Sequence, residues 1–249
     1  MILLIDAGNT RLHWAYADRH ALLNTGHRQH HGKLPSAVTT AWRDGDRPDR
    51  VMMASVTAGK LAQAIHEWVS QSWNMLPEEM TTASHAAGVH NGYREPGQLG
   101  VDRWLALIAA YHRYQRSVCV FDCGTALTAD VVAGDGRHLG GLIMPGLTMM
   151  RQSLSSGTEA IPEISASGDQ ADNWLAGNTR DAVSSGTQYM QLAVIRQFVS
   201  DARKALGEEP VCVVTGGAAR PVQAMLGDRC HYDPDLVFHG MLVMAGTDI

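Results

Sequence analysis

The sequence has few aromatic residues, few cysteines and no long hydrophobic run, and each shortage excludes a class of protein. Only 6% of its 249 residues are aromatic and four are cysteines, although 45% are hydrophobic. We therefore expect an aliphatic core with reduced, buried cysteines, not a disulfide framework. No apolar run approaches the roughly 20 residues that cross a bilayer, so no membrane association is predicted.

Basic residues are also too few to give the chain a positive surface. The sequence has 20 lysines and arginines against 25 acidic residues, a formal net charge of −5. This balance argues against a nucleic-acid partner, although local backbone geometry can still hold a small anion. The sequence starts without a basic segment or a small-residue cleavage site, so a cytoplasmic location is expected.

Glycine, by contrast, is abundant, with 25 residues in the chain. That is about a tenth of all residues, where globular proteins average about 7%. Since glycine is favoured at turns and where backbones approach closely, many of these residues are expected at such positions.

Hydrophobic periodicity predicts strands that first form a meander and then alternate with helices. Residues 2–6 and 12–16 are expected to form a hairpin around Gly8-Asn9-Thr10. The other expected strands are 21–25, 51–56, 118–122, 127–133, a strand that ends near 143, and 211–214; the expected helices are 61–69, 102–115 and 179–206, and 157–178 is expected to be a surface loop or flap.

The sequence repeats one pattern near the start of each half. Asp6-Ala7-Gly8-Asn9-Thr10 and Asp122-Cys123-Gly124-Thr125-Ala126 each follow an apolar run, and the two aspartates are 116 residues apart. A repeat on this scale indicates duplicated units. We therefore predict an α/β protein with mixed sheets and two similar halves, residues 1–116 and 117–249, around a central cleft.

The repeated pattern suits phosphate binding. Glycine lets backbone N–H groups approach a phosphate, the hydroxyl adds a donor, and a carboxylate can hold Mg²⁺. A single copy would more often be an ordinary strand-to-turn sequence, but two copies favour an ATP site between the halves. We call residues 6–13 the first phosphate loop and 122–126 the second phosphate loop.

A second segment, 93–104, combines irregular backbone with charge at the start of an expected helix. Asp102 is placed to cap that helix, and Arg103 lies in its first turn. Alternatively, the Asp102 carboxylate accepts a proton from a substrate hydroxyl while the Arg103 guanidinium orients an anionic group. The residues alone leave these two interpretations open.

Four histidines, His20, His27, His30 and His31, cluster near the first hairpin. They lack a cysteine partner and a helical spacing typical of metal ligands. We expect them to be exposed hairpin residues.

Taken in order, several short motifs resemble those of type III pantothenate kinases, some of which are described as Bvg accessory factor homologues. The resemblance covers most of the chain. The motifs are Asp6-x-Gly8-Asn9-Thr10, Pro96-x-x-Leu99-Gly100-x-Asp102-Arg103-Trp104, Asp122-x-Gly124-Thr125-Ala126-x-Thr128-x-Asp130, Gly140-Gly141-x-Ile143-x-Pro145-Gly146 and Gly177-Asn178-Thr179.

The resemblance implies two ribonuclease H-like halves in an acetate and sugar kinase/Hsp70/actin fold. It also implies ATP-dependent phosphorylation of pantothenate, the first step of coenzyme A biosynthesis, by a homodimer. Asp102 matches the general base, and Asp122 a ligand for a monovalent cation, K⁺ or NH₄⁺; Mg²⁺ is expected near Asp6. The matching pantothenate contacts are Tyr93, Gly100, Val101, Asp102, Arg103 and Thr179, and the matching ATP contacts are Asp6, Ala7, Gly8, Asn9, Thr10, Arg11, Leu12, His13 and Thr125.

Residue 13 departs from that family, several members of which have lysine where this chain has His13. Since histidine is largely neutral near pH 7, we do not expect it to neutralise a phosphate. Two alternatives remain: a non-catalytic nucleotide-binding regulator of the same fold, and a related kinase or phosphatase acting on another small acid. Loss of Asp6, Asp102 or Asp122 would have favoured the regulator, but all three are present.

Overall fold

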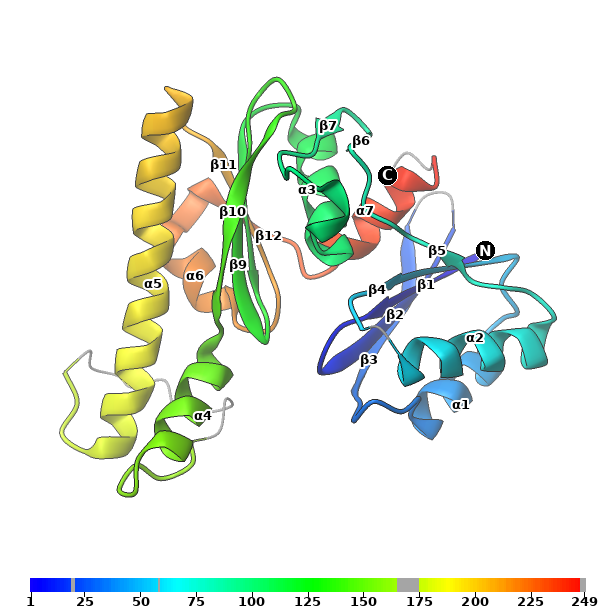
Figure 1. The fold of residues 1–249 in the computed structure, drawn as a ribbon, viewed down its shortest axis with the longest axis horizontal. Coiled ribbons are helices and arrows are strands. Elements are labelled where there is room, and N and C mark those ends of the chain that lie inside the picture. The colour runs from blue at the N-terminus through cyan, green and yellow to red at the C-terminus, as the bar shows by residue number, and fades with distance from the viewer. Residues whose placement is uncertain (19–20, 58, 165–174, 247–249) are drawn as a thin grey trace. The chain divides into compact units, whose positions relative to one another are not determined.

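The computed structural model describes residues 1–18, 21–57, 59–164 and 175–246 (Figure 1). They form two compact units: Met1–Arg113 together with the C-terminal segment from Asp235 make unit 1, and Tyr114–Pro234 make unit 2. The predicted halves, 1–116 and 117–249, differ from these units chiefly at the C-terminus, which returns to unit 1. A central cleft between the halves stays a prediction.

Unit 1 contains a five-stranded mixed sheet with the order β3-β2-β1-β4-β5. β1 runs antiparallel to β2 and parallel to β4. Its elements are β1 (Ile2–Ala7), β2 (Arg11–Ala17), β3 (Leu22–Gln29), α1 (Ser36–Asp44), β4 (Arg50–Ser55), α2 (Lys60–Trp73), β5 (Glu78–Glu79), β6 (His85–Ala86), β7 (Val89–His90), the 3₁₀ helix η1 (Pro96–Gln98), α3 (Val101–Tyr114) and α7 (Leu236–Met244).

Alternation along these strands gives the sheet two apolar faces, and helices cover both. Leu3 and Ile5 pack with Trp42 of α1 and Ile65 of α2. Leu4, on the opposite face, packs in a second core with residues of α3 and α7. The sheet is therefore a buried layer between two pairs of helices (Figure 1).

Unit 2 repeats this topology with the strand order β10-β9-β8-β11-β12. β8 is antiparallel to β9 and parallel to β11, just as β1 is antiparallel to β2 and parallel to β4. Its elements are β8 (Val118–Cys123), β9 (Ala126–Val132), β10 (His138–Pro145), α4 (Leu147–Gly157), α5 (Thr179–Leu206), β11 (Val211–Thr215), α6 (Ala219–Leu226), the 3₁₀ helix η2 (Gly227–Arg229) and β12 (Cys230–Tyr232). The shared strand order confirms the predicted duplication.

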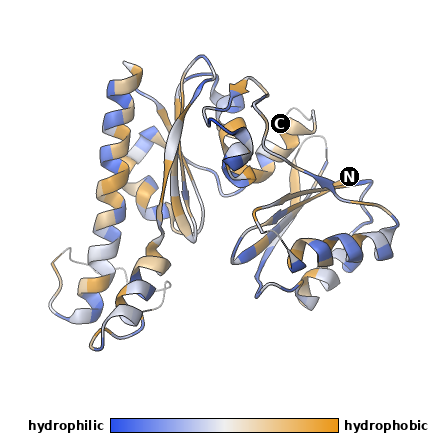
Figure 2. Cartoon of the chain, viewed as in Figure 1, coloured by the Kyte–Doolittle hydropathy of each residue, from blue (hydrophilic) through white to orange (hydrophobic). Residues whose placement is uncertain are grey.

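The core of unit 2 lies between its sheet and helices α5 and α6. Phe121 and Val214 pack with Ile195 of α5 and Val222 of α6. Hydrophobic and hydrophilic residues both occur along α5 (Figure 2), and its Ile195 and Ala202 are buried in this core. All four cysteines are free and buried, as predicted.

Most of the predicted elements are present with boundaries shifted by a few residues. The helix 179–206 is confirmed in full, whereas α1, α4, α6 and α7 were not predicted. Of the predicted loop 157–178, residues 165–174 lie outside the described part of the chain. Among the helices that are described, none is long and apolar enough to cross a membrane.

Candidate active site

The first phosphate loop is the tight connection between β1 and β2. The Gly8 amide donates a hydrogen bond to the Arg11 carbonyl at 3.0 Å, and a Cβ on Gly8 would lie 3.1 Å from that same oxygen. Asp6 stands beside the turn as the partner of His13 in the β1–β2 ladder. Ala7 and Leu12 are fully buried and pack in the core of unit 1, which anchors the loop on the sheet.

His13 lies on β2 with its ring stacked on that of His27, the two ring centroids being 5.5 Å apart. Burial lowers the pKa of His13 to about 4, and His27 and Arg11 add to this shift. The imidazole is therefore neutral at pH 7. This agrees with the expectation that residue 13 supplies no fixed positive charge to the loop.

The second phosphate loop connects β8 to β9 and is held by backbone bonds. The Gly124 amide donates to the Ala126 carbonyl, and the Gly146 amide donates to the Thr125 carbonyl, each at 3.1 Å. A side chain on Gly146 would overlap the carbonyls of Gly124 and Thr125. Gly146, at the start of α4, therefore lets the backbone pack directly against this loop.

Two glycines approach Asp122 closely. A Cβ on Gly216 would lie 2.5 Å from Asp122 Oδ1, and one on Gly124 would lie 3.3 Å from it. Gly216 also has φ of +89°, a conformation that residues with a side chain rarely adopt. The Asp122 carboxylate therefore lies close to the backbone at Gly216 and Cys123, and hard cations prefer carboxylate and carbonyl oxygen donors.

The start of α3 brings Gly100, Asp102 and Arg103 together. The helix begins at Val101, so Asp102 lies in its first turn and the prediction that it caps the helix was wrong. Asp102 Oδ1 accepts a hydrogen bond from the Arg103 amide at 2.8 Å. A Cβ on Gly100 would lie 2.6 Å from the same oxygen, so the carboxylate depends on a glycine at this position.

Arg103 and Tyr93 form a second contact at this end of the helix. Arg103 is only 7% exposed; its Nη1 donates to the Tyr93 hydroxyl at 2.9 Å, and its guanidinium carbon lies 5.6 Å from the Tyr93 ring centroid. Both residues were predicted to bind one substrate, and the structure places them in contact.

Asn91 holds the loop that carries Tyr93, a role that the sequence analysis missed. Asn91 Oδ1 accepts from the Tyr93 amide at 3.0 Å, and its Nδ2 donates to the carbonyls of Ala83 and Pro96, both at 3.2 Å. This side chain thus uses both donors and an acceptor to join three stretches of backbone. Its place shortly before an irregular Pro- and Gly-containing segment was the only signal in the sequence.

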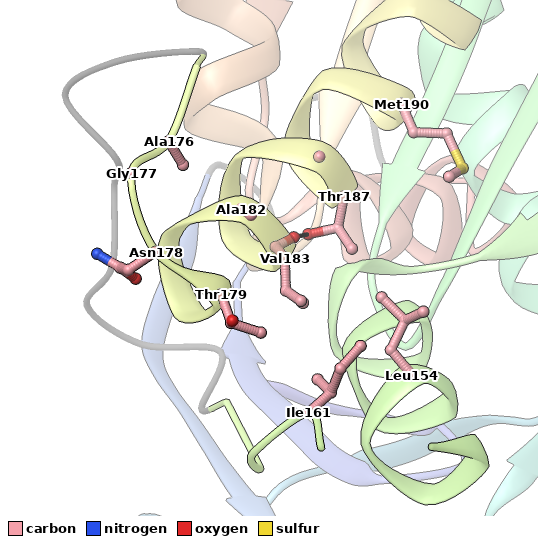
Figure 3. A pocket seen from close by; sticks show the side chains of 11 residues that line it. Leu154, Ile161, Ala176, Gly177, Asn178, Thr179, Ala182, Val183, Thr187 and Met190 are labelled. Carbon is pink, nitrogen blue, oxygen red and sulfur yellow. Dashed lines mark hydrogen bonds between the residues drawn. The ribbon is translucent and has the colours of Figure 1, made fainter. Parts of the chain in front are cut away.

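Thr179 lies in unit 2, at the first residue of α5. The preceding Asn178 caps the helix by accepting a hydrogen bond from the Asp181 amide at 2.9 Å. Thr179 lines a pocket of about 630 Å³ between α4 and α5 (Figure 3). Most of the lining is apolar, with Leu154 and Ile161 facing α5.

The two units divide the predicted site residues between them. The first phosphate loop and the 93–103 segment belong to unit 1, while Asp122, Thr125 and Thr179 belong to unit 2. Their convergence on one bound nucleotide and one substrate stays a prediction. Among the described residues, no three His, Cys, Asp or Glu side chains are grouped to hold a metal ion.

Comparison with known proteins identifies the family. The family model described as type III pantothenate kinase matches residues 2–201. The chain belongs to the type III pantothenate kinase family. A type III pantothenate kinase from Nitrosococcus oceani is 36% identical over 252 residues, covering 98% of this chain and 94% of that one. One from Azoarcus sp. is also 36% identical, covering 100% of this chain and 92% of its own.

Solved structures show that this chain has the predicted acetate and sugar kinase/Hsp70/actin fold. A Baf family protein from Campylobacter jejuni superimposes with a TM-score of 0.62 at 20% identity, covering 98% of this chain and 97% of that one. The activator of the 2-hydroxyisocaproyl-CoA dehydratase from Clostridium difficile, solved with bound ADPNP, has a TM-score of 0.52 at 11% identity, covering 97% of this chain and 91% of its own.

The predicted exposed histidine cluster is only partly confirmed. His27 and His31 are exposed, and His20 lies outside the described residues. His30 is buried, with 6% of its surface exposed, so that part of the prediction was wrong. The reason is tertiary, because His30 packs against the turn of the first phosphate loop.

Proposed function

We propose that this protein transfers the γ-phosphoryl group of ATP to the terminal hydroxyl of pantothenate. The observation that carries the proposal is the cluster at the start of α3, where Asp102 adjoins a buried arginine that is hydrogen-bonded to Tyr93. In a member of this kinase family, that cluster supplies both a proton acceptor and a cationic substrate contact.

The reaction we propose is an in-line displacement. The hydroxyl oxygen of pantothenate forms a bond to the γ-phosphorus as the bond to the β,γ-bridging oxygen breaks, and ADP leaves with that electron pair. Asp102 accepts the hydroxyl proton. Arg103 and Tyr93 orient the substrate with Thr179 and the backbone of Gly100 and Val101, since positioning supplies most of the catalysis in such transfers.

We propose that ATP is held by backbone donors from both phosphate loops. The first loop contributes residues 6–13 and the second contributes Thr125. Mg²⁺ near Asp6 would balance phosphate charge. Mg²⁺ usually takes one or two carboxylates together with phosphate oxygens and water, which suits a region without a cluster of acidic side chains among the described residues.

We propose Asp122 as the ligand of a monovalent cation, K⁺ or NH₄⁺. The support is the close approach of Gly124 and Gly216 to Asp122 Oδ1, where a side chain at either position would crowd the carboxylate. Such a cation would add positive charge near the second phosphate loop. Replacing potassium by sodium at constant ionic strength should lower activity, and equal activity in the two salts would contradict the site.

We also propose that the active form is a homodimer in the cytoplasm. The edge strand β10 exposes Leu139, Leu142 and Ile143, and α5 exposes Tyr189 and Met190. Large apolar residues gathered on a sheet edge are typical of surfaces that associate. Sedimentation velocity on the wild-type chain and on Ile143→Glu tests this, since a dimer that the substitution leaves intact would argue against β10 as its interface.

The proposed function is tested by measuring ADP release with and without pantothenate in potassium buffer, with the product identified by mass spectrometry. Asp102→Asn should retain its fold and lose about 10²- to 10⁴-fold in kcat, the range expected for a general base. Asp228→Asn, an exposed aspartate of η2, is the control and should match the wild type. Wild-type turnover in Asp102→Asn would contradict the role of Asp102, and ADP release independent of pantothenate would contradict the substrate.

A further inference from the structure

His30 forms hydrogen bonds with two backbone carbonyls of the first phosphate loop, those of Gly8 and Thr10. It directly follows β3, and its Nε2 lies 2.8 Å from the Gly8 carbonyl oxygen. Its backbone amide donates to the Thr10 carbonyl at 3.1 Å. Its other ring nitrogen, Nδ1, lies 3.2 Å from the amide of Gly32. Three polar groups of one buried residue are therefore occupied at the turn.

These contacts define which nitrogen of the neutral ring carries the hydrogen. The Gly32 amide can only donate, so Nδ1 must carry a lone pair. The Gly8 carbonyl can only accept, so Nε2 must carry the hydrogen. Only the neutral Nε2–H tautomer of His30 satisfies both neighbours, because the doubly protonated ring would place a hydrogen against the Gly32 amide.

The hydrogen bond to the Gly8 carbonyl also sets the orientation of the next backbone amide, that of Asn9. A trans peptide is planar, so its N–H points opposite to its C=O, and no cis peptide occurs among the described residues. Holding the Gly8 carbonyl toward His30 therefore turns the Asn9 amide to the other side of the turn. In the same way, the His30 amide on the Thr10 carbonyl sets the direction of the Arg11 amide.

We propose that His30 is a positioning residue of the ATP site, which orients the Asn9 amide toward the phosphates through its Nε2–H bond to the Gly8 carbonyl. The inference rests on the proposed function, because it takes the first phosphate loop as an ATP contact. The His30 ring touches no substrate itself. Its effect is on ATP and not on pantothenate, whose predicted contacts in unit 1 lie in the separate 93–103 segment.

Two substitutions separate the contacts of the ring. The amide nitrogen of Gln in His30→Gln extends to the place of Nε2 and can donate to Gly8. The shorter side chain in His30→Asn reaches only the place of Nδ1 and cannot. Both variants keep the backbone bond to Thr10. His31→Ala, at the exposed neighbouring position, is the matched control.

The experiment measures the Kd of ATP by calorimetry without pantothenate, and then KM for each substrate. We expect His30→Asn and His30→Ala to weaken ATP binding about three- to tenfold, as for the loss of one hydrogen bond. We expect His30→Gln and His31→Ala to stay within about twofold of the wild type, and KM for pantothenate to be unchanged in all four. Should His30→Ala fail to fold, the Gln and Asn variants decide the matter.

Two results would overturn the inference while leaving the proposed function intact: a His30→Asn variant that binds ATP as the wild type does, or equal weakening in the Gln and Asn variants. A wild-type protein that binds no ATP would instead overturn the proposed function, and the role of His30 with it. Long-range ¹H–¹⁵N NMR gives an independent readout, since it should report an unprotonated Nδ1 on His30 in the free protein.

Discussion

The Asp102 carboxylate occupies space that only a glycine at position 100 leaves open. A Cβ on Gly100 would lie 2.6 Å from Asp102 Oδ1, and that oxygen accepts the Arg103 amide at the start of α3. The end of a side chain is cheaper to move than backbone. A methyl group at position 100 should therefore displace the carboxylate rather than unfold the helix.

Gly100→Ala should accordingly lower kcat about tenfold or more while the free energy of unfolding changes by less than about 1 kcal/mol. Steady-state kinetics and urea unfolding measure the two effects. Gly97→Ala is the matched control, since a Cβ there meets nothing within 4 Å. A Gly100→Ala enzyme with wild-type kcat would show that the observed position of the carboxylate is not needed for the reaction.

Tyr93→Phe removes the hydroxyl that accepts Arg103 Nη1 at 2.9 Å and retains the ring. Loss of an acceptor for a buried charged donor costs about 1–3 kcal/mol. We expect KM for pantothenate to rise about tenfold with a smaller change in kcat. Tyr232→Phe is the control, because the guanidinium of Arg220 lies 4.1 Å from that ring and the ring is kept. An unchanged KM would separate Tyr93 from substrate binding.

The pKa of His13, lowered by burial to about 4, should make stability depend on pH. The unfolded chain has an ordinary histidine pKa near 6.5 and takes up the proton first. The free energy of unfolding should therefore fall as the pH drops from about 6.5 toward 4, and be independent of this group above pH 6.5.

His13→Gln should remove that part of the pH dependence, as measured by urea unfolding at several pH values. NMR titration of the wild-type imidazole gives the pKa directly. A midpoint near 6.5 would contradict the partly buried, neutral state of His13. A rise in the pKa of His13 on addition of ATP would place the ring close to the phosphates.

Gly216→Ala should destabilise unit 2. Gly216 has φ of +89°, and a Cβ would lie 2.7 Å from the backbone carbon of Cys123. Because backbone cannot move aside cheaply, we expect a loss of about 1–3 kcal/mol, measured by urea unfolding. Gly157→Ala, with open space around its Cβ position, should stay within about 1 kcal/mol. Equal stability of both variants would refute the close approach at Gly216.

Local sequence patterns were sufficient to predict the strands and turns that the two halves share. Short apolar runs indicated β1 and β8, and period-two alternation indicated β2 and β9. The helical stretch 179–206 appeared with its predicted ends. The two aspartate-glycine turns, 116 residues apart, predicted the duplication that the matching strand orders confirm. These features could be predicted because spacing along the chain sets which side chains share a face and where the backbone turns.

Contacts between distant segments were decided only by the tertiary structure. The apolar helix α7 could have packed on either half, and it joins unit 1, where Gly240 lies against the Leu105 carbonyl. Nothing in its polar surroundings set His30 apart from His27 or His31, yet a connection across 22 residues brings it to Gly8. The sequence by itself determined the two-fold architecture and the residue types of the site. Burial, tautomer and close approach were settled only when the chain folded, because they depend on neighbours that are remote in the sequence.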